Sequence, residues 1–273
     1  MDAGAAAFLI ALGLKDRIVG TAAPDFKADF SGAMREQLDD VPVLSGGRGD
    51  KETVIAAKPD LVTGISPYEF GSFDGTPTYA QLRANGIAAL VACDTSRRPV
   101  TTIDATYEYI RHLADLFHVP GRGKKIIASM KREAAARTST VDGAHRTPVL
   151  TLSAVPTGGA GINTSGGASL TNGVITLAGG HNIAASKVSK FAALSAEEVA
   201  RRNPHVIVAV TGFTSKTDRQ LIDAIKSSPL LADTDAVKKD RVIAVPQRIL
   251  LSPSLLNPRA IRDVAEAVKD ASS

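Results

Sequence analysis

The stretch that decides the fold is Ile175-Thr176-Leu177-Ala178-Gly179-Gly180-His181-Asn182-Ile183-Ala184, followed by Leu194-Ser195-Ala196-Glu197-Glu198 and Asn203-Pro204-His205-Val206-Ile207-Val208. The paired glycines predict a surface loop. Ser195, followed by Glu197 and Glu198, predicts a capped helix start. The β-branched run after the Pro predicts a buried strand. Loop, helix and strand in this order indicate an α/β unit.

The first half of the chain carries a companion pattern at 12–20 (Leu-Gly-Leu-Lys-Asp-Arg-Ile-Val-Gly), 43–44 (Val-Leu) and 57–64 (Ala-Lys-Pro-Asp-Leu-Val-Thr-Gly). In order and spacing, the two halves together resemble the substrate-binding proteins that feed ABC importers for ferric siderophores, haem and cobalamin. The resemblance spans nearly the whole chain. It implies the class III fold: two Rossmann-like lobes with mainly parallel sheets, joined by a long rigid helix.

Strand-like and helical runs alternate along the chain, which predicts mainly parallel sheets. In the first half we expect strands at 17–21, 60–63 and 87–93 and helices at 5–14, 52–57 and 78–85. In the second half we expect strands at 149–153, 206–210 and 242–245, helices at 196–201 and 218–225, and a glycine-rich loop at 157–167. A closing helix begins at Asn257-Pro258, with Ile261, Val264, Ala265 and Val268 as its inward stripe.

A change of period after residue 100 divides the chain. Apolar residues recur at helical spacing from 101 to Pro120-Gly121, and a second helix follows to about 137. We therefore expect an N-terminal lobe at 1–100, a helical linker at 101–138 and a C-terminal lobe at 139–273. The resemblance also implies a first strand ahead of the helix at 5–14, which this sequence lacks, and a signal peptide often bearing a lipid-modified Cys.

Composition is that of a soluble globular protein, with 44% hydrophobic and 22% charged residues. The net charge of +4 divides into −3 for residues 1–100, +2 for 101–145 and +5 for 146–273. The basic second half indicates an acidic ligand or partner, or a solvated basic face. Dispersed basic residues do not suggest nucleic-acid binding. The single cysteine, Cys93, is expected to be a buried, inert thiol, and it excludes an internal disulfide.

Ligands of α/β sheets bind beyond the carboxyl ends of the strands, so the loops there supply the candidate site residues. They are Arg48, Tyr68, Arg97, Arg98, Thr157, Phe213 and Arg248. Several Arg side chains facing one ligand favour an anion, which they bind by charge-assisted forked hydrogen bonds. A ferric siderophore meets that requirement. The alternatives are an ordinary exposed pair at Arg97 and Arg98, and a purely structural Tyr68.

The resemblance adds two further residues. Phe191 lies six residues before Glu197, where relatives often place an aromatic ring against the ligand; the alternative is a Phe at the core rim. Glu197 occupies the position of the acidic residue that meets an Arg of the permease, and it is equally suited to the positive end of a helix. Thr76 occupies the matching first-lobe position, so Glu69 or Asp74 would have to substitute there.

Enzyme motifs are incomplete in this sequence. No segment completes a dinucleotide fingerprint, a P-loop or a G-x-S-x-G elbow, and the five His residues lack metal-ligand spacing. We therefore expect a monomeric extracytoplasmic protein, lipid-anchored in its precursor, that binds a ferric siderophore and delivers it to an ABC permease without catalysis or a resident cofactor. Haem, with Tyr68 or His181 as iron ligand, is the nearest alternative cargo, followed by cobalamin. An enzyme on a chelatase-like two-lobed scaffold acting on a tetrapyrrole is the alternative from another class.

Overall fold

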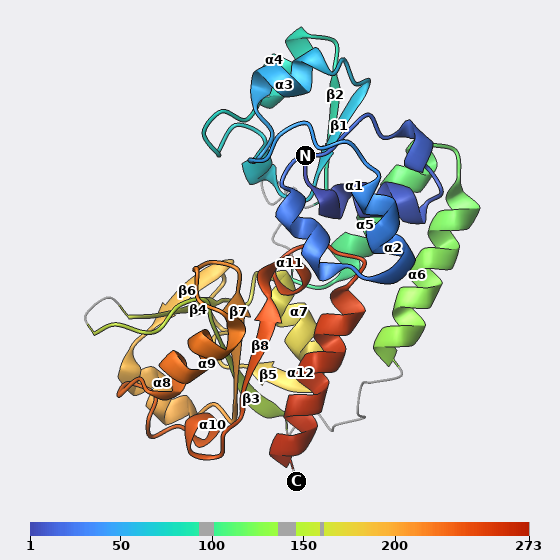
Figure 1. Ribbon diagram of the computed structural model, residues 1–273. Coiled ribbons are helices and arrows are strands. Elements are labelled where there is room, and N and C mark those ends of the chain that lie inside the picture. Colours follow the sequence, from blue (N-terminus) through green and yellow to red (C-terminus); the bar gives the residue numbers. More distant parts are fainter. Residues whose placement is uncertain (93–100, 136–145, 159–160, 273) are drawn as a thin grey trace. The chain divides into compact units, whose positions relative to one another are not determined.

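The computed structural model describes residues 1–92, 101–135, 146–158 and 161–272, which form two compact units (Figure 1). Unit 1 comprises Met1–Arg98, Asp104–Ser129 and Ser252–Leu255, and unit 2 comprises Pro99–Ile103, Met130–Leu251 and Leu256–Ser273. Cys93 and the polar stretch 138–145 lie outside the described residues. Within the described part, no helix combines the length and apolarity that crossing a membrane requires.

Unit 1 contains a small parallel sheet among short helices. Its helices are α1 (Ala3–Ala11), α2 (Gly32–Asp39), α3 (Lys51–Ala56), α4 (Tyr79–Ala84), α5 (Asp104–Leu116) and the first part of α6 (Pro120–Ala135), with 3-10 turns at Lys15–Arg17, Pro24–Asp29 and Pro67–Glu69. Strands β1 (Leu61–Gly64) and β2 (Ala88–Val91) pair in parallel, with Leu61 opposite Ala88. The strand expected at 17–21 is reduced to one parallel bridge between Thr21 and Val43.

Tyr109 of α5 is fully buried in unit 1. Its ring meets Phe8 of α1 edge-on at 5.1 Å between centroids. Its hydroxyl forms a hydrogen bond with the hydroxyl of Thr63 in β1, so the buried phenol is satisfied. Helices α1 and α5 are thereby fixed against the sheet.

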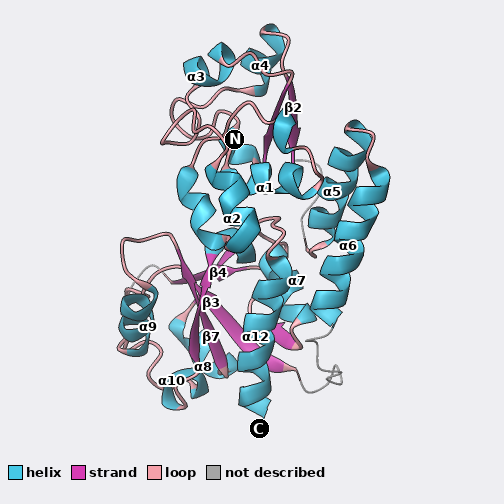
Figure 2. Ribbon diagram, turned by 45° about the vertical axis from the view of Figure 1, so that its right-hand side comes forward, coloured by secondary structure: helices cyan, strands magenta, loops and turns pink. Residues whose placement is uncertain are grey.

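Unit 2 is a larger α/β sandwich. Its strands are β3 (Thr147–Leu152), β4 (Ile162–Ser165), β5 (Gly180–Asn182), β6 (Phe191–Leu194), β7 (Val206–Thr211) and β8 (Val242–Pro246), and its helices are α7 (Leu170–Leu177), α8 (Ala196–Arg202), α9 (Asp218–Lys226), α10 (Asp235–Lys238), α11 (Gln247–Leu250) and α12 (Asn257–Ser272). The main sheet is wholly parallel in the order β5-β3-β7-β8, and β4 and β6 form a separate antiparallel pair. Helices α7 and α12 lie on one face of the main sheet and α8, α9 and α10 on the other (Figures 1 and 2).

The α/β class with mainly parallel sheets is confirmed. Every residue of β7 is buried, as a central parallel strand between two helical layers requires. The four residues of the expected inward stripe of α12 are all buried. Two expectations are wrong: the loop expected at Gly179-Gly180 contains β5, and the glycine-rich loop expected at 157–167 contains β4. Both strands are short, and β5 contains no apolar run, so their pairing comes from tertiary contacts rather than from a sequence pattern.

Candidate functional site

The carboxyl edge of the unit 2 sheet carries a small hollow. Its lining residues come from the ends of β3 and β7, from the β4–β6 pair and from the turns that follow: Thr151, Ser153, Asn163, Thr164, Ser165, Phe191, Val210, Phe213 and Leu251. Two candidates from the sequence, Phe191 and Phe213, are therefore brought to one hollow. Phe191 lies in strand β6 and Phe213 in the turn after β7.

The polar groups of this hollow are held in place by one another. The hydroxyls of Thr151 and Thr164 lie 3.1 Å apart, and the amide of Ser165 donates to the Thr151 hydroxyl at 3.1 Å. This arrangement fixes the hydroxyl positions before any ligand arrives, which lowers the ordering cost of binding.

Two exposed rings border the hollow. Phe191 is 55% exposed and Phe213 is 49% exposed, although both are large apolar side chains. The ammonium group of Lys190 lies 5.4 Å from the centroid of the Phe191 ring, within cation–π range. The hollow thus combines apolar surface, ordered hydroxyls and a positive charge at its border.

Unit 1 carries a second candidate face, formed around Arg48. Its guanidinium carbon lies 5.0 Å from the centroid of the Phe73 ring and 5.9 Å from that of Phe26. The ring of Phe73 lies 6.4 Å from that of Tyr68. We call Phe26, Arg48, Tyr68 and Phe73 the arginine–aromatic cluster. Ring contacts use the face of a guanidinium and leave the N–H groups at its edge able to meet an anion.

The loops that carry the cluster are held by short polar contacts. The hydroxyl of Ser45 donates to Asp50 at 2.8 Å and accepts from the amide of Gly47 at 3.1 Å, so the turn bearing Arg48 has a defined shape. On the neighbouring loop, the hydroxyl of Ser66 accepts from the amide of Tyr68 at 3.3 Å. Sequence reasoning missed Phe26 and Phe73. Phe73 lies in a loop after a strand and could have been found by the rule that ligands bind there, whereas Phe26 lies beyond the short loop that follows the strand expected at 17–21.

Glu69 belongs to the inside of unit 1. It is only 6% exposed, and one of its carboxylate oxygens accepts from the amides of Ile65 at 3.0 Å and Ser66 at 2.7 Å. Burial, and secondarily the nearby carboxylate of Asp2, raise the pKa of Glu69 well above its ordinary value. Glu69 therefore cannot serve as a first-lobe docking residue, whereas Asp74 is exposed.

The remaining candidates are dispersed. Thr157 is exposed on the loop after β3, and Arg248 is half-buried in α11 directly after β8; neither lines the hollow. Glu197 is exposed in the first turn of α8, where Glu198 and Ser195 form the capping box. Arg97 and Arg98 lie outside the described residues.

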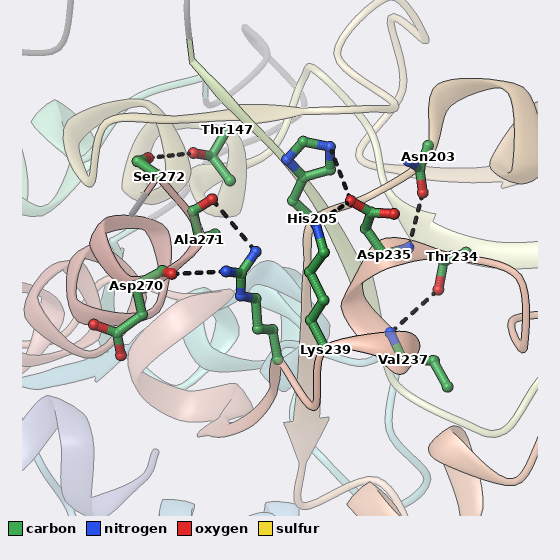
Figure 3. A network of polar contacts seen from close by, with 11 residues as sticks. Thr147, Asn203, His205, Thr234, Asp235, Val237, Lys239, Asp270, Ala271 and Ser272 are labelled. Atoms are coloured by element: carbon green, nitrogen blue, oxygen red, sulfur yellow. Dashed lines mark hydrogen bonds and ion pairs between the residues drawn. The ribbon is translucent and has the colours of Figure 1, made fainter.

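The amino edge of the unit 2 sheet is, by contrast, occupied by structural contacts. The carboxylate of Asp235 accepts from the ammonium of Lys239 at 2.7 Å and lies 3.8 Å from the Nε2 of His205, and the backbone amide of Asp235 donates to the side-chain oxygen of Asn203 at 2.9 Å (Figure 3). Nearby, the hydroxyls of Thr147 and Ser272 lie 3.0 Å apart (Figure 3). These polar groups are used to join elements, so the carboxyl edge is the better place for a ligand.

Comparison with known proteins assigns the family. A model of the family described as periplasmic binding protein matches residues 1–249. The chain belongs to this family. No curated protein sequence matches the chain.

Solved structures support the same fold. An ABC-type Fe3+-hydroxamate transport system from Saccharomonospora viridis superposes with a TM-score of 0.76 at 24% identity, covering 98% of this chain and 91% of that one. The periplasmic heme-binding protein RhuT from Roseiflexus gives a TM-score of 0.74 at 24% identity, covering 100% and 97%. A periplasmic binding protein from Veillonella parvula gives 0.80 at 20% identity, covering 98% and 89%. At these identities the likeness shows the fold alone.

The motif that carried the family resemblance has a structural role in this member of the periplasmic binding protein family. The buried amide nitrogen of Asn182 donates to the carbonyl of Ser165 at 3.0 Å, and its oxygen accepts from the amide of Ala184 at 3.0 Å. Asn182 thus ties β5 to the end of β4. A Cβ at Gly166 would lie 2.2 Å from the carbonyl oxygen of Ser189, so this neighbouring turn requires glycine.

His181 is in a different place from the one expected for a haem ligand. Its strand pairs with the first residues of β3, with His181 opposite Pro148. Because β3 continues to Leu152, His181 lies about 13 Å short of the carboxyl edge. The described residues hold no group of three or more His, Cys, Asp or Glu arranged for a metal ion. Among the described candidates for ligating haem iron, Tyr68 remains.

Proposed function

We propose that this protein is an extracytoplasmic substrate-binding protein that captures an anionic ferric siderophore and delivers it to an ABC permease. The observation that carries the proposal is the arginine–aromatic cluster, in which Arg48 lies 5.0 Å from one ring and 5.9 Å from another. A siderophore presents organic surface and anionic oxygens together. Aromatic rings pack against the organic surface, and a guanidinium donates hydrogen bonds to the anionic oxygens.

The hollow of unit 2 supports the same class of ligand. It offers hydroxyls, two half-exposed rings and the nearby Lys190, and it offers no His or carboxylate among its lining residues. Acid–base chemistry at this face would require such groups. We therefore propose binding and delivery without catalysis, and not a chelatase-like enzyme.

Haem is the second candidate ligand, because the half-exposed Tyr68 of the arginine–aromatic cluster is a residue type that can ligate haem iron. A tyrosinate bound to haem iron would give a Soret band on mixing. Cobalamin is a weaker candidate ligand, because the chain lacks Trp and its aromatic content is 4%, which leaves few rings to hold it.

Delivery requires a surface for the permease, and we propose Glu197 as its acidic contact in unit 2. The residue is exposed and its side chain is not needed for the capping box, which uses Glu198. Lipid anchoring of the precursor and a monomeric state belong to the same proposal. Arg97, Arg98, Thr157 and Arg248 remain ligand candidates from the sequence.

The proposal is tested by titrating the protein with ferric siderophores, the same siderophores without iron, haem and cobalamin, followed by calorimetry. We expect one ferric chelate to bind and Arg48→Ala to weaken it at least about tenfold, because a hydrogen bond to a charged group is worth about 1.5–3 kcal/mol. Arg219→Ala is the matched control, since Arg219 is almost fully exposed on α9. Equal affinities of the Arg48→Ala and unaltered proteins, or binding of haem alone, would contradict the siderophore assignment.

A further inference from the structure

Helix α6 carries a row of exposed cations that the ligand-binding proposal does not use. The helix is continuous over its whole length (Figure 1), and five of its basic side chains are exposed. Arg122 donates to the carbonyl of Leu12 at 2.8 Å. We call the other four the basic face: Lys124, Lys125, Lys131 and Arg132. Within the described residues no carboxylate pairs with Lys124, Lys125 or Arg132, so these cations are available to an anionic partner.

The opposite side of α6 is used for packing, which fixes the direction of the cations. Met130 and Ala134 are buried, and a Cβ on Gly123 would lie 2.6 Å from the Cβ of Ala114 in α5. Positions 123, 130 and 134 are seven and four residues apart, so they share one side of the helix. At about 100° per residue, the centre of the basic face lies about 140° from that side. The cations therefore project away from the packed side of the helix.

The basic face consists of two pairs of cations. The second pair follows the first by seven residues, so the pairs lie about 10 Å apart along the helix axis. The exposed residue between them is Ala128, whose short side chain does not hold a flat surface away from the cations. Glu133, the acidic residue of this helix, is turned about 140° from the centre of the face. The face thus presents charge of one sign, which raises the local concentration of an anionic partner.

The composition of the basic face favours an anionic lipid surface over a protein partner. Protein–protein interfaces are depleted in Lys and depend on buried aromatic or Arg anchors in well-packed pockets. Three of the four residues of the basic face are Lys, and none is a large apolar residue. A lipid surface requires no such anchor, because each Lys or Arg held near anionic headgroups strengthens attachment about fivefold. Membership of the periplasmic binding protein family places the chain outside the cytoplasm, where it can reach the outer surface of a membrane.

We propose that the basic face of α6 is a docking surface for the headgroups of anionic phospholipids and holds this helix along the membrane surface. If two of the four cations contribute fully, they strengthen attachment about thirtyfold. Attachment of this strength is reversible by itself, and a basic face acts most effectively together with a second signal such as a lipid chain. The docking surface is separate from the cargo-binding residues, so it does not depend on which ligand the protein carries.

The test measures co-sedimentation of the whole chain with mixed phosphatidylglycerol–phosphatidylcholine vesicles and with phosphatidylcholine vesicles alone, at about 0.1 M salt. One variant combines Lys124→Gln, Lys125→Gln, Lys131→Gln and Arg132→Gln, and Gln keeps the helix propensity of these exposed positions. The matched control, of equal net charge, combines four exposed changes elsewhere: Arg83→Gln, Arg201→Gln, Lys216→Gln and Arg219→Gln. We expect the partition coefficient on the mixed vesicles to fall at least about thirtyfold in the variant and less than about threefold in the control. Equal losses in the two proteins, or no binding of the unaltered chain to the mixed vesicles, would overturn the proposal.

Two further measurements locate the contact and identify the class of partner. Acylation of the unaltered chain by a water-soluble reagent, read by mass spectrometry, should slow at Lys124, Lys125 and Lys131 when mixed vesicles are added and stay unchanged at the exposed Lys216. Equal slowing at Lys216 would overturn the assignment to α6. Polyglutamate, at a carboxylate concentration equal to that of phosphatidylglycerol, should leave the protein on the vesicles, and complete release would replace the lipid by an acidic protein as the partner. None of these readouts requires cargo, so they can fail or succeed independently of the siderophore titration.

Discussion

Replacing either exposed ring of the unit 2 hollow should weaken siderophore binding while leaving the fold intact. A Phe side chain has roughly 200 Å² of surface, and Phe191 leaves 55% of its area exposed. About 110 Å² is thus available for a ligand, worth up to about 2.7 kcal/mol at about 25 cal/mol per Å². Covering half of that area gives about 1.4 kcal/mol, or about tenfold in Kd. The same reasoning applies to Phe213, which is 49% exposed.

The assay is calorimetric titration of Phe191→Ala and Phe213→Ala with the ferric siderophore that binds the unaltered protein. Val188→Ala serves as the control, because Val188 is 91% exposed on the same connection but does not line the hollow. Thermal unfolding should show Tm shifts of no more than about 2 °C, since exposed side chains contribute little to the core. Affinities of both Phe variants within twofold of the control would refute the argument that the hollow contacts the cargo.

Three other changes test the remaining residues. Glu69→Gln should stabilise the protein at pH 8 and flatten the pH dependence of its stability. Because the pKa of Glu69 is raised, the stability that its neutral form provides is complete below the ordinary pKa of 4.5 and is lost as pH rises through the folded-state pKa. A Tm that falls from pH 5 to 8 in the variant as well as in the unaltered protein would contradict this reasoning. Ser195→Ala should lower stability by about 1 kcal/mol through loss of the α8 cap, seen in chemical denaturation; a change below about 0.3 kcal/mol would show that the cap is dispensable. Glu197→Lys should leave siderophore affinity unchanged and reduce uptake by cells or permease-containing vesicles, and normal uptake would remove Glu197 from the docking surface.

Long periodic segments were predictable from the sequence because local and tertiary preferences agree there. The buried run of β7 and the four-residue inward stripe of α12 are examples, since each element is specified by its own apolar pattern. The strand expected at 17–21 shows the opposite case. Its β-branched residues favour extension, but a strand also needs neighbours, and only Thr21 has a ladder partner in the described chain.

The sequence predicted only part of the candidate site, because the rule used there depends on strands that the sequence can reveal. The rule that ligands bind after parallel strands selected Arg48 and Tyr68, and the structure connects them through Phe73. Phe26 joins the cluster from the 3-10 turn Pro24–Asp29, which lies beyond the short loop at 20–24 that follows the strand expected at 17–21, so the rule did not select it. His181 was misplaced because a glycine pair was taken for a loop at the ligand face, whereas pairing with the start of β3 puts it near the other edge.

The motif around Asn182, which is the strongest sequence signal, therefore indicates the fold, whereas the residues of the ligand face determine which ligand binds. The buried side-chain amide of Asn182 donates to the carbonyl of Ser165 and accepts from the backbone amide of Ala184, and the fold needs these hydrogen bonds whichever ligand the protein binds. The residues that would meet cargo, such as Phe191 and Phe213, are half-exposed and contribute little to the core, so the fold places few demands on their identity. A chain can consequently keep the scaffold signal while its ligand face changes, which is why the family follows from the sequence and the cargo has to be found by titration.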